Sequence, residues 1–387
     1  MQFRQFGKLI WKVSALGFGA MRLPTTGEDE SLFNPNIDKP TAIKMIRHSI
    51  DQGINYVDTA YPYHRGKSEI LVGQALKDGY RKKVKLATKM PSWLVKSYED
   101  FDRYLNEQLE RLQTDHIDFY LLHGMNKKLW PKVRDLGALA WAEKRIKDGL
   151  ISYLGFSFHD DFDTFKEIID AYGSWTFCQI QYNFMDIEYQ AGIKGLDYAS
   201  DKGLAVVIME PLRGGQLTKE PPPSVKKLWE SASSKRSPAD WALQWIWNQP
   251  GVSVVLSGMS SMQQVNENIA SAECSGVASL GEKDLALIDQ VREIYRKLSP
   301  IPCTNCEYCM PCPNGVHIPH AFICYNDSII YNDPQTPRFH YFSQPQHKWA
   351  DNCIECLECH EKCPQEIPIS QWLKKAHDFF CKSDSTR

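Results

Sequence analysis

The feature of this sequence that most limits its possible folds is a regular alternation of short β-rich runs and longer amphipathic runs. Most β-rich runs are continuously apolar, such as residues 205–208, as is typical of parallel strands covered on both faces. The expected strand and helix pairs are 15–18 with 40–52, 54–57 with 67–77, 84–88 with 97–112, 117–122 with 134–148, 151–156 with 162–171, 176–180 with 191–201, 204–208 with 224–232 and 238–248, and 252–256 with 261–272. Eight such units predict an α/β fold, a closed (β/α)8 TIM barrel rather than an open doubly wound sheet.

Two further elements are expected around the barrel. The alternation on either side of Gly7-Lys8 predicts a small hairpin within residues 2–13. Residues 282–298 read as a helix that packs on the outside of the barrel before the chain changes in character.

Four polar side chains stand at the expected carboxyl ends of three successive strands: Asp58 with Tyr63 after it, then Lys89 and His123. These strand ends converge on one mouth in a barrel. There Tyr63 would protonate a carbonyl oxygen, although a free phenol has a pKa near ~10. Lys89 would favour the phenolate, Asp58 would hold the lysine, and His123 would orient the carbonyl. The structural alternative is a buried Asp58–Lys89 ion pair and a satisfied histidine at a strand end.

Six spaced stretches carry a family resemblance. They are Gly17-Phe18-Gly19-Ala20-Met21, Asp58-Thr59-Ala60 followed by Tyr63, Ala87-Thr88-Lys89, Leu121-Leu122-His123, Gln179-Ile180-Gln181-Tyr182-Asn183, and Gly258-Met259-Ser260-Ser261 to Asn268. Over roughly residues 3–275 the sequence resembles the aldo-keto reductases. The resemblance implies a (β/α)8 barrel floored by the hairpin. It also implies hydride transfer from NADP or NAD to a small-molecule carbonyl substrate, with Asp58, Tyr63, Lys89 and His123 as the catalytic tetrad.

The resemblance further implies a set of cofactor-binding residues. Ser157 and Gln179 match positions that hold the nicotinamide carboxamide. The remaining matches are Gly19 in the first motif and, for the adenosine half, Gly258, Ser260, Gln264 and Asn268.

The chain departs from the family pattern at three places near the cofactor. Phe158 stands where asparagine is usual, and Met209 where many members stack an aromatic ring on the nicotinamide. Gln264 occupies a place often taken by an arginine that grips the 2'-phosphate, so a bidentate anion contact is missing. The choice between NADP and NAD therefore stays open. Arg213 is a candidate for a phosphate contact instead, the alternative being a solvated loop arginine.

The last part of the chain is set apart by its cysteines, since only Cys178 and Cys274 of the twelve precede residue 303. The two runs are Cys303-x2-Cys306-x2-Cys309-x2-Cys312-Pro313 and Cys353-x2-Cys356-x2-Cys359-x3-Cys363-Pro364. The second is the bacterial ferredoxin run, in which three thiolates hold one [4Fe-4S] cluster and the fourth reaches another. In a reducing compartment such clustering indicates metal binding rather than disulfides. A zinc site and free thiols are the alternatives.

Two [4Fe-4S] clusters with crossed ligation are expected from this repeat. One would be held by Cys303, Cys306, Cys309 and Cys363, and the other by Cys353, Cys356, Cys359 and Cys312. The change in composition predicts a domain boundary near 299–302, with a barrel domain over 1–298 and a ferredoxin-like domain over 299–387. A helical run at 319–331 suggests that the second domain is mostly helical. The whole chain resembles a subfamily of aldo-keto reductases with such a C-terminal domain.

Net charge and hydropathy limit the kinds of partner and the cellular location to be expected. A net charge of -2 argues against general affinity for nucleic acid or anionic membranes. The first residues lack the apolar core of a signal peptide, and no long apolar run is present. The expected location is cytoplasmic.

Hydride transfer moves two electrons at once, whereas a [4Fe-4S] cluster moves one. The leading hypothesis is a carbonyl reductase whose clusters exchange electrons with another carrier, such as an electron-transfer protein. Phe158 and Met209 motivate an alternative in which a flavin or a radical substrate replaces the nicotinamide. A second alternative is non-catalytic, with the barrel as a binding or assembly module and the clusters as a docking or redox-sensing element.

Overall fold

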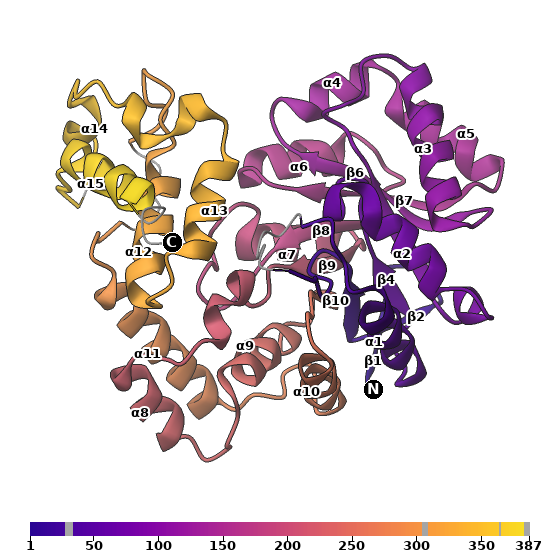
Figure 1. The fold of residues 1–387 in the computed structure, drawn as a ribbon, viewed down its shortest axis with the longest axis horizontal. Coiled ribbons are helices and arrows are strands. Elements are labelled where there is room, and N and C mark those ends of the chain that lie inside the picture. The colour runs from indigo at the N-terminus through magenta and orange to yellow at the C-terminus, as the bar shows by residue number, and fades with distance from the viewer. Residues whose placement is uncertain (28–33, 304–308, 364, 383–387) are drawn as a thin grey trace. The chain divides into compact units, whose positions relative to one another are not determined.

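The computed structural model describes residues 1–27, 34–303, 309–363 and 365–382 (Figure 1). The chain divides into two compact units, Met1–Pro211 with Asp240–Gly281, and Leu212–Ala239 with Glu282–Arg387. The boundary expected after residue 298 falls inside the second unit, at the end of α11 (Glu282–Leu298). As a boundary between domains it remains a prediction.

The first unit is built around a closed barrel of eight parallel strands, in the order β10-β3-β4-β5-β6-β7-β8-β9. The strands are β3 (Leu16–Gly19), β4 (Tyr56–Asp58), β5 (Lys85–Met90), β6 (Ile117–Met125), β7 (Ile151–Phe158), β8 (Phe177–Gln181), β9 (Ala205–Met209) and β10 (Val252–Ser257). Apart from β10 and β3, which close the barrel, neighbouring barrel strands are consecutive along the chain, so each crossover is one βα unit. The predicted (β/α)8 barrel is confirmed.

Helices follow the strands as the alternation predicts, with one difference. They are α1 (Lys39–Asp51), α2 (Lys67–Ala75), α3 (Glu99–Leu112), α4 (Leu129–Asp135), α5 (Ala138–Lys147), α6 (Phe162–Asp170), α7 (Gly192–Asp201), α8 (Pro223–Ser231), α9 (Pro238–Trp247) and α10 (Met262–Glu273). The prediction of a single helix over 134–148 is wrong, since α4 ends and α5 begins within this range. Gly137, with φ of 88°, ends α4 and starts α5, because a left-handed residue cannot continue a right-handed helix.

The predicted hairpin is present as β1 (Phe3–Gln5) paired antiparallel with β2 (Lys12–Ser14). Its turn places the Phe6 ring in the barrel core, 4.7 Å from the Phe119 ring and 6.0 Å from that of Tyr56. Gly7, with φ of 55°, lies so close to the start of β9 that a Cβ there would be 2.6 Å from the backbone nitrogen of Ala205. The hairpin therefore closes the end where the strands begin, and the opposite end is left for a site.

The second unit is helical around a small core of its own. Besides α8 and α11 it contains α12 (Ile318–Ile330), α13 (Gln335–Ser343), the short α14 (Glu358–Glu361) and α15 (Ile369–Lys382). Buried Phe322, Tyr325, Tyr341, Leu373 and Phe380 form the core. The helix expected over 319–331 is confirmed as α12, whereas α13 and α15 were not predicted. The ferredoxin-like character of this unit remains a prediction.

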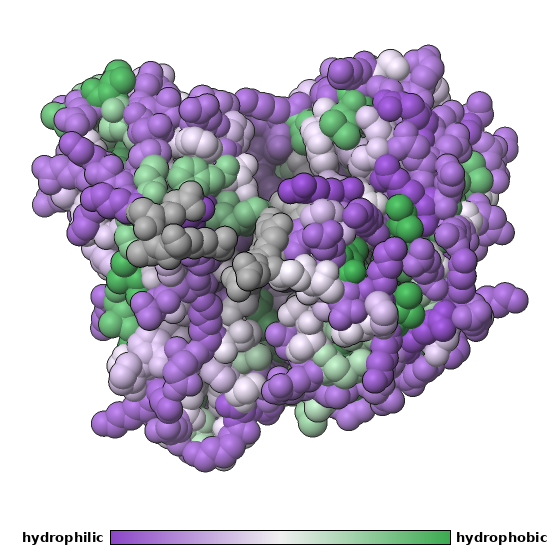
Figure 2. Space-filling view, in the orientation of Figure 1, coloured by the Kyte–Doolittle hydropathy of each residue, from purple (hydrophilic) through white to green (hydrophobic). Residues whose placement is uncertain are grey.

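The described helices show no membrane-crossing segment. In the part of the chain that the structure describes, none is both long and apolar enough to span a bilayer. The face in Figure 2 is mainly hydrophilic, with hydrophobic residues gathered in small separate patches.

Candidate active site

The predicted tetrad lies at the carboxyl ends of three adjacent strands. Asp58 is the last residue of β4, Lys89 is near the end of β5, and His123 is near the end of β6. Tyr63 opens a short 3-10 helix, Tyr63–Gly66, just after β4. These strands are parallel neighbours, with Asp58 in register with Ala87, so the side chains emerge at one end of the barrel.

The Lys89 ammonium is the centre of this group. Its Nζ donates to Asp58 Oδ1 at 2.5 Å and to the backbone oxygen of Thr59 at 2.9 Å. The same nitrogen lies 3.3 Å from the Tyr63 hydroxyl. Lys89 is 1% exposed and Asp58 2% exposed, so the pair is shielded from water. The chain thus builds a buried cation within hydrogen-bonding distance of a phenol.

His123 completes the group from the side of β6. Its ring lies edge-on to Tyr63, with 6.2 Å between centroids, and 5.1 Å from the ring of Trp93. Its Nδ1 is buried without a hydrogen-bond partner. The structure therefore brings all four predicted residues together, while their catalytic roles remain predictions.

Burial and charge set the protonation of Tyr63 and Lys89. Burial raises the pKa of Tyr63; Lys89 lowers it and Asp58 raises it, and the net change is upward. Burial is the largest single influence and lowers the pKa of Lys89, but Asp58 and Tyr63 together raise this pKa by more, so the net change is upward. Lys89 thus lowers the pKa of Tyr63, whereas burial, the larger influence, raises it.

The charge state of His123 follows from the same surroundings. Burial, the Lys89 ammonium and His159 together hold the pKa of His123 well below its usual value. A neutral imidazole still carries one N–H, so the ring can donate a hydrogen bond without bringing a second charge to the site.

A buried network behind β5 fixes Lys89, and sequence reasoning missed it. Gln108 on α3 donates to the backbone oxygen of Lys89 at 3.0 Å and to Glu69 Oε1 at 2.7 Å. Glu69, fully buried on α2, also accepts from Thr88 at 2.7 Å and pairs with Arg111 at 3.2 Å. Each buried polar group has a partner, which holds the strand end in one position.

Two of the predicted cofactor residues are neighbours on adjacent strands. Ser157 on β7 is in register with Gln179 on β8. Ser157 Oγ accepts from the backbone nitrogen of Gly124 at 2.8 Å, which leaves its hydroxyl proton available. Gln179 Oε1 is buried and has no hydrogen-bond partner. A hydroxyl donor beside an unused amide acceptor fits the carboxamide of a nicotinamide.

Three of the residues expected at the adenosine half have hydrogen-bond partners around the start of α10. Gln264 Oε1 accepts from the backbone nitrogen of Ser260 at 2.8 Å, and Asn268 donates to Ser257 Oγ at 3.0 Å. Ser261 caps α10 by accepting from the nitrogen of Gln264. These contacts shape the start of α10.

The other predicted positions have different surroundings. Gly19 lies where a Cβ would be 3.3 Å from the backbone oxygen of Ser257, so it allows β3 and β10 to pack closely. Phe158 is fully buried, with its ring 5.0 Å from that of Phe165 on α6. Arg213 belongs to the second unit, where it pairs with Asp327 on α12 at 3.0 Å. A phosphate contact by Arg213 remains a prediction.

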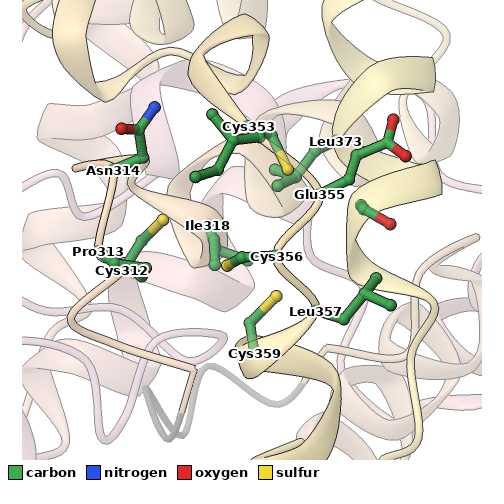
Figure 3. Close-up of a pocket in the computed structure, with 12 residues that line it drawn as sticks. Cys312, Pro313, Asn314, Ile318, Cys353, Glu355, Cys356, Leu357, Cys359 and Leu373 are labelled. Atoms are coloured by element: carbon green, nitrogen blue, oxygen red, sulfur yellow. The ribbon is translucent and has the colours of Figure 1, made fainter.

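In the second unit, cysteines from both runs meet at one pocket (Figure 3). It is lined by Cys312 from the first run and by Cys353, Cys356 and Cys359 from the second. Figure 3 shows their thiols around a common space between two loops. Burial, and the neighbouring thiols of Cys353, Cys356 and Cys312, raise the pKa of Cys359 to about 11.

The other cysteines of the two runs are placed as follows. Cys303, Cys309 and Cys363 pack against the core of the second unit but do not line that pocket. Cys306 lies outside the described residues.

Comparison with known proteins agrees with the barrel fold. The family model described as the aldo/keto reductase family matches residues 15–293. This chain belongs to the aldo-keto reductase family. Its fold and its oxidoreductase class follow from that membership, whereas the match ends before Cys303 and does not reach the cysteine runs.

The matches to individual relatives cover most of each relative's length. L-galactose dehydrogenase of Arabidopsis thaliana is 28% identical over 324 residues, which is 77% of this chain and 97% of that protein. The NADH-specific methylglyoxal reductase of Escherichia coli is 27% identical over 308 residues, 68% of this chain and 91% of that protein. Among solved structures, the holo form of aldo-keto reductase AKR11C1 from Bacillus halodurans is similar with a TM-score of 0.62 and 28% identity, covering 75% of this chain and 96% of that one.

Proposed function

We propose that the barrel reduces an aldehyde or ketone to an alcohol with NADPH or NADH. The observation that carries this proposal is the buried Lys89 ammonium, 2.5 Å from Asp58 and 3.3 Å from the Tyr63 hydroxyl. A purely structural ion pair would not require a phenol hydroxyl within hydrogen-bonding distance of the lysine.

The chemistry follows from the groups at the mouth. A nicotinamide bound there supplies a hydride to the carbonyl carbon. Tyr63 donates its hydroxyl proton to the carbonyl oxygen as negative charge develops on that oxygen. Lys89 stabilises the phenolate that Tyr63 becomes. Neutral His123 donates a hydrogen bond that orients the carbonyl.

Binding of the carboxamide is the first test. Replacing Gln179 by leucine removes the buried acceptor and is expected to raise the Kd for NADPH about fivefold, which corresponds to one hydrogen bond of ~1 kcal/mol. Titration followed by tryptophan fluorescence measures it. Gln249→Leu is the matched control, since Gln249 bonds to Trp245 just before β10 begins, away from the mouth.

The outcomes of that titration separate two conclusions. An unchanged Kd in Gln179→Leu would remove this residue from the cofactor site. If the wild-type protein bound neither NADPH nor NADH, the proposed reaction itself would be wrong. A flavin in place of the nicotinamide, the alternative that Phe158 and Met209 motivate, would show its own absorption bands in the purified protein.

We further propose that the second unit holds iron-sulfur clusters. In the part of the chain described here, no three Cys, His, Asp or Glu side chains come together as ligands for a single metal ion. Four cysteines nevertheless line one pocket, which fits the wider spacing of thiolates around a [4Fe-4S] cluster better than a zinc site. Cys312, Cys353, Cys356 and Cys359 would hold one cluster, and Cys303, Cys306, Cys309 and Cys363 the other. Such clusters supply one-electron transfer.

The surface beside this pocket suits an electron-transfer partner. Ile354 and Leu357, which line the pocket, are 65% and 49% exposed, although side chains of this kind are usually buried. Exposed Glu355 lies between them in the loop, and exposed Glu358 and Glu361 follow in the short helix α14. A redox protein with a basic rim around an apolar centre matches this surface in charge and in hydropathy.

A further inference from the structure

Arg22 is a cation at the barrel mouth that the reaction described above does not use. It follows β3 by three residues, and β3 ends beside Asp58, whose backbone oxygen accepts from the nitrogen of Ala20 at 2.8 Å. Arg22 is therefore at the same end of the barrel as the tetrad.

The side chain of Arg22 crosses Gly258, the residue that follows β10. A Cβ on Gly258 would lie 3.1 Å from Cδ of Arg22 and 3.2 Å from its Cβ and Cγ. Those contacts are tighter than ordinary packing allows, so the missing side chain at Gly258 makes room for the arginine. The stem is thereby held against the loop that leads from β10 into α10.

The guanidinium at the end of this stem has an unused donor. Nη2 of Arg22 is buried and has no hydrogen-bond partner, and among the described residues no carboxylate pairs with Arg22. A buried N–H on a permanent cation is costly when it is left without an acceptor. We therefore expect the Nη2 donor of Arg22 to bind an acceptor that does not belong to the described residues.

The loop that Arg22 crosses leads to a position suited to an anion. Gly258 precedes the start of α10, where the helix dipole favours negative charge. Gln264, in the first turn of α10, is neutral and already bonded to Ser260, so it offers no cation. Arg22 thus brings a positive charge to this loop.

Resting on the proposed use of NADPH or NADH, we propose that Arg22 binds a phosphate of the dinucleotide at a subsite built where it crosses Gly258. The ligand chemistry is a phosphate oxygen accepting from the guanidinium. Two phosphates qualify, the pyrophosphate that both cofactors carry and the 2'-phosphate of NADPH alone.

Titrations of the full chain with NADPH and with NADH test this subsite. Arg22→Gln is expected to raise the Kd about tenfold or more, as expected for loss of a charge-assisted hydrogen bond. If Arg22→Gln weakens the binding of both cofactors, Arg22 contacts the pyrophosphate. If it weakens the binding of NADPH alone, Arg22 contacts the 2'-phosphate. Arg22→Lys should recover part of the affinity, because lysine keeps the positive charge but lacks the bidentate donor geometry of the guanidinium. In either assignment, raising the KCl concentration should weaken cofactor binding less in Arg22→Gln than in the wild type.

Two controls keep the result specific. Arg103→Gln makes the same change at an exposed arginine of α3 that pairs with Asp100, and should leave both Kd values unchanged. Gly258→Ala, which pushes the Arg22 stem away while keeping its charge, should weaken binding in the same direction as Arg22→Gln. If a folded Arg22→Gln variant bound both cofactors with wild-type affinity, the inference about Arg22 would be overturned, but the proposed reaction would not. No binding by the wild type would instead overturn the proposed reaction.

Discussion

Replacing Tyr63 by phenylalanine is expected to lower kcat for carbonyl reduction about 10³-fold, the scale of loss when a general acid is removed. The phenylalanine ring fills the same space, so the Asp58–Lys89 pair keeps its contacts and only the donated proton is lost. Initial rates of NADPH oxidation with a series of small aldehydes measure the effect. The Kd for NADPH should stay within about twofold of the wild type, because the hydroxyl acts on the carbonyl.

Tyr61→Phe is the matched control for that experiment. Tyr61 lies two residues earlier, but its hydroxyl donates to Glu107 on α3 at 2.8 Å, away from Lys89. Its loss should leave kcat nearly unchanged. If Tyr63→Phe kept more than about a tenth of wild-type activity, the tetrad would be a structural ion pair with aromatic neighbours, and the acid would have to be sought elsewhere.

The barrel was predictable because its signals are local and repeated. Strands covered on both faces are apolar throughout, and the residue where each run ends marks the barrel mouth. This is why Asp58, Lys89 and His123 could be placed together from the sequence. The break between α4 and α5 was harder, because Gly137 within an otherwise helical pattern reads equally well as a tolerated glycine.

Other parts of the site lacked a local signal. Glu69 and Gln108 are polar residues on helices and read as solvent-exposed, yet both are buried because they satisfy one another behind β5. Arg22 gains its significance only from Gly258, which is at the other end of the barrel sequence. By contrast α15 carried a readable signal, since Ile369, Leu373, Ala376 and Phe380 recur at helical spacing and are all buried.

The clusters provide the second large expected effect. Anaerobically purified protein is expected to contain about eight iron and eight sulfide per chain, as two [4Fe-4S] clusters require. Cys359→Ala and Cys312→Ala should each reduce both counts to about half, because both residues line the same pocket. Chemical analysis of iron and sulfide, with metal analysis for zinc, measures this. Cys274→Ala, at an exposed cysteine of the barrel unit, should change neither count.

The double variant Cys312→Ala with Cys359→Ala tests how the two runs share their ligands. Cys312 lines the pocket with the second run, whereas Cys363 does not line it. In this crossed arrangement both replacements fall on one cluster, so about half of the iron should remain, bound by the other cluster. If each run instead held its own cluster, each would lose a ligand and nearly all of the iron would be lost. Zinc in place of iron, or iron content indifferent to all of these cysteines, would show that the second unit is not an iron-sulfur module.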